Sequence, residues 1–160
     1  MTAMALDWGI VARAVHLLAV VVWIGGVWLV TTVLLPGLKQ EAPDDWLNKF
    51  EAVEGRFAPQ VRIAVLLVLL SGLYMLYAYD LWDRFRNARF WWMHLMVGVW
   101  LIFAALLYVI EPLAGQRTFR ARVSRAPETV LNAMLWMHRA LLALSLLAIF
   151  AAIGGSYGLF

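Results

Sequence analysis

Four long apolar segments constrain the fold of this chain more than any other feature. They cover roughly residues 9–34, 58–80, 88–111 and 128–155, and each exceeds the ~20 residues that cross a bilayer. Backbone groups in lipid must pair within their own segment, so each segment is predicted to be a helix. The chain is 64% hydrophobic and 14% charged, whereas soluble domains are about half apolar and about a quarter charged. We therefore predict an all-α integral membrane protein with a single transmembrane domain over residues 1–160.

The short connections between the four segments favour an up-down-up-down four-helix bundle, because sequential helices then pack as antiparallel neighbours. Both termini would share one end of the bundle with the loop over residues 80–89. Four basic residues belong to that end: Arg13, Arg84, Arg86 and Arg89. Nine belong to the other end: Lys39, Lys49, Arg56, Arg62, Arg117, Arg120, Arg122, Arg125 and Arg139. The positive-inside rule then predicts periplasmic termini in a bacterial inner membrane. Because this topology accounts for the basic residues and the net charge of +3, we predict no nucleic-acid partner.

The connection between the first two spans contains a helical pattern of its own. Pro43, followed by two aspartates, is typical of a helix start. Trp46, Phe50, Val53 and Phe57 then recur at helical spacing, with charged residues between them. This pattern predicts a short amphipathic helix that lies in the membrane interface and runs into the second span.

The first span carries a histidine, and an imidazole in hydrocarbon is costly unless it has a partner. On a helix, His16 falls on one stripe with Arg13, Trp23 and Gly26. The stripe offers a metal ligand, a cation, an aromatic wall and a small residue that lets a flat group approach. We therefore treat it as a candidate haem site, in which Trp23 and Gly26 contact the cofactor. The alternative for Trp23 is packing in the core of the bundle.

A second histidine lies at a matching depth in the third span. His16 and His94 each lie roughly 8 Å from the middle of their spans toward the same end, whereas His138 lies roughly 5 Å toward the other. Two imidazoles on diagonal helices can bind one haem iron from opposite sides. The alternative is that each histidine only bonds a neighbouring helix.

Further residues fit such a haem site. Gly72 and Gly98 would leave room for the porphyrin, although glycines in spans also serve helix packing. Arg13 and Arg89 could pair with the propionates. His138 has no second histidine at its level, so it could serve a quinone, a proton path, a hydrogen bond or, with a methionine, a second haem.

The same residues resemble a known family. His16, Trp23 and the glycine pair that ends at Gly26 are similar to the first span of copper-resistance-D-like membrane proteins and of HemJ-type protoporphyrinogen oxidases. The likeness continues through residues 50–59, the Ser71-Gly72 pair and the Trp-Met-His-Leu-Met stretch over 92–96. It implies a four-helix protein that binds haem b, with His16 as one axial ligand.

The chain departs from the HemJ-type pattern at one ligand position. The lysine that follows the histidine of span three in that pattern is Met96 here, and the Leu-Pro-Arg segment after span one is missing. The resemblance therefore leaves His94 or Met96 as the partner of His16, and it does not carry over the oxidase activity.

Three functions remain open from the sequence. The first is a membrane b-type cytochrome with one haem, or two, that transfers electrons to or from a quinone or a periplasmic redox protein. The second is a copper-binding or copper-transport protein, since Met96 and His138 belong to Met/His clusters suited to Cu(I). The third is a non-catalytic membrane subunit or assembly factor that docks a larger complex or associates with itself as a homo-oligomer. With no cysteine, thiolate metal sites are excluded.

Overall fold

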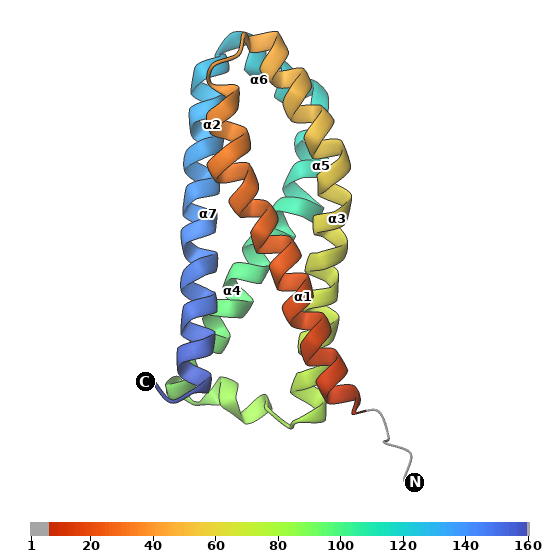
Figure 1. The fold of residues 1–160 in the computed structure, drawn as a ribbon, viewed down its shortest axis with the longest axis vertical. Coiled ribbons are helices and arrows are strands. Elements are labelled where there is room, and N and C mark those ends of the chain that lie inside the picture. Colours follow the sequence, from red (N-terminus) through yellow and green to blue (C-terminus); the bar gives the residue numbers. More distant parts are fainter. Residues whose placement is uncertain (1–6, 160) are drawn as a thin grey trace.

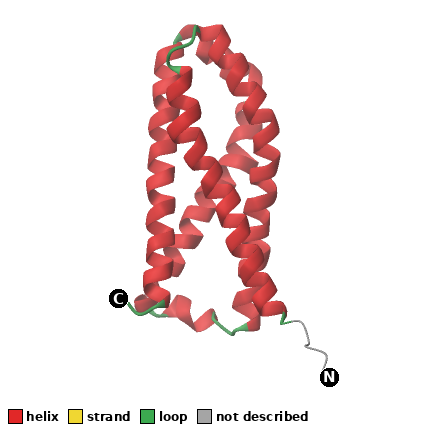
Figure 2. Cartoon of the chain, viewed as in Figure 1, coloured by secondary structure: helices red, strands yellow, loops and turns green. Residues whose placement is uncertain are grey.

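In the computed structural model, which describes residues 7–159 apart from the side chains of Pro43, Asp44 and Gln116, the chain is helical with short loops at the ends of the bundle (Figure 2). The α-helices are α1 (Trp8–Leu29), α2 (Leu35–Leu38), α3 (Pro43–Ala78), α4 (Trp91–Ala105), α5 (Glu111–Ala114), α6 (Gln116–Arg125) and α7 (Pro127–Ser156). Two π-helical segments, η1 (Val30–Leu34) and η4 (Leu106–Ile110), and two 3-10 turns, η2 (Trp82–Arg86) and η3 (Ala88–Phe90), complete the order. The described residues contain no strand, so the all-α prediction is confirmed.

Within residues 7–159, four helical stretches are long and apolar enough to cross a membrane. They are Trp8–Leu38, Asp45–Ala78, Ala88–Ala114 and Pro127–Ser156. These stretches confirm the four predicted spans and the integral membrane fold. As predicted from the short connections, α1 begins and α7 ends at the same end of the bundle (Figure 1). We call this the terminal end, and the other the opposite end.

The first and third spans cross over one another, with α3 and α7 on either side (Figure 1). α1 packs chiefly along α3, and α4 packs chiefly along α7. Towards the opposite end, η1 and α2 contact α7, while η4 contacts α3. Each crossing span therefore changes neighbours part-way along its length, and the cluster around Trp23 joins all four spans where they meet.

Prolines account for the two π-helical segments. Pro36 and Pro112 each follow a π segment by two residues, and a proline within a helix removes one i→i−4 hydrogen bond and crowds the carbonyl four residues earlier. The residue before each proline donates instead to the carbonyl five residues back: Leu35 to Val30, and Glu111 to Leu106. The first and third spans are thus widened at matching places, a feature that often marks functional sites.

The predicted amphipathic helix over 43–57 is not a separate element. It forms the first turns of α3, whose 36 residues span about 54 Å, well beyond the ~30 Å hydrocarbon core. Trp46 and Phe50 are buried, and they pack with residues of α2, α6 and α7. The apolar stripe therefore faces protein over most of its length, although Val53 remains exposed.

Helix α6 covers this part of α3. From the sequence, its residues belong to the connection between the third and fourth spans. Val123 of α6 is buried against the same cluster, and the Phe119 ring lies 6.1 Å from that of Phe50. Arg120 pairs with the Glu51 carboxylate, and this hydrogen bond, aided by the negative charge, raises the pKa of Arg120 above its usual value. The helix is therefore fixed to the bundle by both apolar and ionic contacts.

Candidate functional site

His16 is held against α3 by its ring nitrogen. Nδ1 lies 3.1 Å from the Val68 carbonyl oxygen and 3.0 Å from the Ser71 hydroxyl oxygen. The half-buried imidazole therefore links the first two spans at a fixed orientation.

The hydrogen bonds around Ser71 determine which nitrogen of His16 carries the proton. A carbonyl oxygen can only accept, so Nδ1 must be the donor toward Val68. The Ser71 hydroxyl donates to Leu67 at 2.5 Å, which leaves its oxygen free to accept from the imidazole. In the neutral ring, Nε2 then keeps a lone pair. Metal-binding histidines in proteins show the same arrangement, with one nitrogen bonded to a carbonyl and the other free for the metal.

The first two spans contain other predicted site residues, and each of them has a different environment. Gly72 faces the imidazole, since a Cβ there would lie 3.5 Å from His16 Cε1. A Cβ on Gly26 would collide with the ring of Phe57, so this glycine serves close packing of α1 on α3. Arg13 is exposed, with its guanidinium 5.3 Å from the centre of the Tyr79 ring.

Among the described residues, no hydrogen bond or ring contact joins His94 of the third span to His16. His94 is exposed in the first turn of α4, and its ring meets that of Phe85 edge-on at 5.4 Å. Met96 is half-buried and packs against the buried cluster that contains Trp23. Gly98 is half-buried with open space around its Cα, and Arg89 is exposed at the terminal end.

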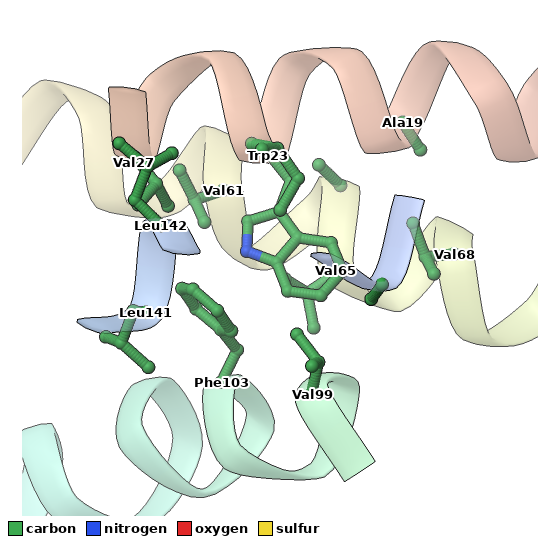
Figure 3. Close-up of a cluster of buried hydrophobic side chains, with 13 residues drawn as sticks. Ala19, Trp23, Val27, Val61, Val65, Val68, Val99, Phe103, Leu141 and Leu142 are labelled. Atoms are coloured by element: carbon green, nitrogen blue, oxygen red, sulfur yellow. The ribbon is translucent and has the colours of Figure 1, made fainter. Parts of the chain in front are cut away.

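Trp23 lies at the centre of the bundle, and it is 4% exposed. Its ring packs at right angles to that of Phe103, with 4.8 Å between the ring centres. Among the residues that the structure describes, its Nε1 is the one fully buried side-chain nitrogen or oxygen without a hydrogen-bond partner. Figure 3 shows this nitrogen on the side of the indole that faces Val27, Leu141 and Phe103.

These three neighbours of the indole nitrogen also line a cavity of about 500 Å³. The cavity extends from the middle of the bundle toward the opposite end, and all four spans contribute to it. Residues of both π-helical segments form part of its wall: Val30, Leu34, Leu106, Leu107 and Ile110. The widened turns therefore coincide with the open space inside the bundle.

The cavity wall is mostly apolar and holds a few polar groups. Arg62 of α3 pairs with Glu111 at 2.5 Å, and the Arg62 carbonyl accepts a hydrogen bond from the Tyr108 hydroxyl. Glu54 lines the same cavity. His138 does too, and its Nδ1 lies 2.9 Å from the Met134 carbonyl oxygen, so Nε2 is free to accept in the neutral ring.

Glu54, Glu111 and the cavity itself were missed as site features by the sequence analysis. In the sequence, Glu111 is a carboxylate beside a proline at the end of an apolar run. Glu54 is a carboxylate within the amphipathic pattern of residues 43–57. Neither pattern indicates that the two residues share a wall, because they lie on different helices.

Replacing Glu111 with glutamine is expected to destabilise the protein by up to about 1 kcal/mol, because Arg62 then loses its counter-charge, while both side chains are 36% exposed and solvent screens the pair in part. The double replacement Arg62→Met with Glu111→Leu is expected to restore most of that loss, since both charges leave together. Thermal unfolding in detergent gives the comparison. A single variant as stable as the parent would show that solvent already screens the pair.

Comparison with family models, with curated proteins and with solved structures finds no match to this chain. The resemblance to copper-resistance-D-like and HemJ-type proteins therefore stays a prediction from short motifs. Groups of three or more histidine, aspartate or glutamate residues that could hold a metal ion do not occur among the described residues either. What the chain shows is a four-helix membrane protein with an anchored histidine near the terminal end and a polar-edged cavity toward the opposite end.

Proposed function

We propose that this protein binds haem b within its four-helix bundle and transfers single electrons in the membrane. The observation that carries the proposal is the anchoring of His16: Nδ1 donates to Val68 and Ser71, and Nε2 keeps its lone pair. That is the state in which an imidazole serves as an axial ligand. Haem supplies a one-electron couple, and the chain's part is to orient the ligand, exclude water and set the surrounding polarity.

The second axial ligand would come from α4. His94 is exposed and faces Phe85, whereas Met96 is half-buried beside the cluster around Trp23, so burial favours Met96. A methionine ligand would raise the reduction potential relative to a second histidine. Arg13 and Arg89 are both exposed at the terminal end, where they would be available to the propionates.

The orientation follows from the distribution of positive charge. We propose that the terminal end, with its four basic residues, is periplasmic, and that the opposite end faces the cytoplasm. The anchored histidine would then lie in the periplasmic half of a bacterial inner membrane, within reach of a periplasmic redox protein, and the cavity in the cytoplasmic half.

A second candidate is copper binding, which one observation favours. Met134, Met137 and His138 all line the cavity, and thioether with imidazole ligands suit Cu(I). These candidate copper ligands are few, and methionine side chains also fill space in apolar helices. Haem binding at His16 therefore remains our first proposal.

Absorption spectroscopy of the protein purified from haem-replete cells tests the proposal. We expect a sharp reduced-minus-oxidised b-type spectrum with at least one haem per chain. Elemental analysis of the same sample should give iron at that ratio and no stoichiometric copper. A colourless protein that does not take up added haem would refute haem binding, and stoichiometric copper without iron would favour the second candidate.

A further inference from the structure

The cavity between the four spans carries more negative than positive charge. Three carboxylates line it, those of Glu51, Glu54 and Glu111, together with the guanidinium of Arg62. Arg62 pairs with Glu111 at 2.5 Å, and Glu51 pairs with Arg120 of α6. Among the residues that the structure describes, no hydrogen bond or salt bridge involves the Glu54 carboxylate. One negative charge of the cavity wall is therefore left without a counter-charge of its own.

The position of Glu54 makes this charge costly. The residue is half-buried in a helical stretch that is long and apolar enough to cross a membrane. An ionisable side chain in such a stretch commonly marks a ligand site or an ion path. The other charges near Glu54 do not remove the imbalance, because Arg62 attracts the carboxylate while Glu111 and Glu51 repel it. The Glu54 carboxylate is thus available to a cation that enters the cavity.

The rest of the wall suits a cation with an apolar body. Four phenylalanines line the cavity: Phe50, Phe57, Phe103 and Phe119. Phe57 of α3 and Phe119 of α6 are only half-buried, so part of each ring is open to contact. Aromatic rings attract cations, and aromatic-lined sites recognise quaternary ammonium groups. The volume of about 500 Å³ falls within the usual range of small-molecule sites, roughly 300–1,000 Å³.

We propose that this cavity binds a monovalent organic cation, whose charge is neutralised by the Glu54 carboxylate and whose apolar body packs against the phenylalanine side chains. The single excess charge determines the class of ligand: one positive charge restores neutrality, whereas an anion would add to the imbalance. A cation with an N–H group can also donate a hydrogen bond to His138 Nε2 in the neutral ring. The site uses neither His16 nor haem, so it is independent of the function proposed above.

Binding of tetraphenylphosphonium, a monovalent cation with four phenyl rings, tests the proposal. The labelled cation is titrated into the full chain in lipid nanodiscs, with empty nanodiscs as the partition control. Mildly alkaline buffer keeps the carboxylates ionised. We expect saturable binding of about one cation per chain. Tetraphenylborate has the same four rings and the opposite charge, so in a separate titration it should bind no more than it does to empty nanodiscs.

Three carboxylate variants locate the contact. Glu54→Gln removes the charge and keeps the size of the side chain, so we expect about tenfold weaker binding of the cation. Glu54→Asp keeps the charge and should stay within about threefold of the parent affinity. Glu128→Gln removes an exposed carboxylate from the first turn of α7, at the same end of the bundle but outside the cavity wall, and should bind like the parent. This control separates a local contact from a general loss of negative charge.

The thermal midpoint of Glu54→Gln should equal or exceed that of the parent protein, because an uncompensated charge leaves the wall; this separates lost binding from lost folding. No saturable binding of the cation by the parent protein would overturn the proposal. Equal affinities of the parent and Glu54→Gln, or saturable binding of tetraphenylborate, would do the same. The haem content of the same samples is a separate readout: haem without cation binding refutes only the cavity ligand, and cation binding without haem refutes only the cytochrome.

Discussion

Alanine in place of His16 is expected to remove the b-type spectrum of the purified protein and to lower its haem content to near zero. The imidazole would supply one axial bond to the iron, and no other described side chain is anchored to Val68 and Ser71 in its place. The reduced-minus-oxidised spectrum and the haem-to-protein ratio give the result. Far-UV circular dichroism checks that the helices remain, because the substitution also removes two contacts between α1 and α3.

Ser71→Ala separates ligation from packing at the same site. The imidazole would keep its bond to Val68 but lose the Ser71 oxygen, and loss of such a supporting contact typically costs 10–100-fold in metal affinity. We therefore expect weaker haem retention with the b-type spectrum still present. Met96→Ala and His94→Ala then identify the second ligand, since only one of them should change the spectrum. An unchanged spectrum in His16→Ala would remove His16 from the haem site.

Gly155→Ala is expected to destabilise the protein clearly. A Cβ at this position would collide with the Trp92 indole, which is 4% exposed and packs with Met93 and Ala151. The indole cannot turn away without separating α4 from α7. Overpacking of this kind costs about 1–3 kcal/mol, which corresponds to roughly 2–12 °C in the thermal midpoint of a chain this size.

Two further variants control this measurement. Gly25→Ala adds the same methyl group at an exposed position where nothing lies within 4 Å, so its thermal midpoint should equal or exceed that of the parent protein. Combining Gly155→Ala with Trp92→Leu should recover part of the loss, because the smaller side chain leaves room for the Cβ. Equal midpoints for Gly155→Ala and Gly25→Ala would show that α4 and α7 adjust without strain.

The spans were predictable because hydropathy and length are properties of the residues themselves. The chain order and the short connections also gave the shared end of α1 and α7. The same reasoning could not identify α6, because its pattern is mostly polar, with Phe119 and Val123 as its apolar contacts to the bundle. The continuity of residues 43–57 with the second span was predicted, but an amphipathic pattern does not reveal that protein rather than lipid covers its apolar face.

The candidate site, too, was predictable from the sequence only in part. His16 could be selected from the sequence because an intramembrane imidazole requires a partner, but its bond to Val68 depends on how α1 lies on α3. Matched depth alone could not tell which way His94 faces, because depth along a span says nothing about rotation around it. In the structure His94 turns toward Phe85. Gly26 likewise serves the Phe57 ring, which comes from another span.

The sequence by itself determined that this chain forms four membrane-spanning helices, and it singled out His16 as a polar residue in need of a partner. Only the tertiary structure decided which helices meet, which nitrogen of His16 is left free, and where a cavity opens between the four spans. The physical reason is the range of the interactions involved. Hydropathy and backbone hydrogen bonding act within one helix, whereas contacts between spans depend on rotation, crossing and the widened turns before Pro36 and Pro112.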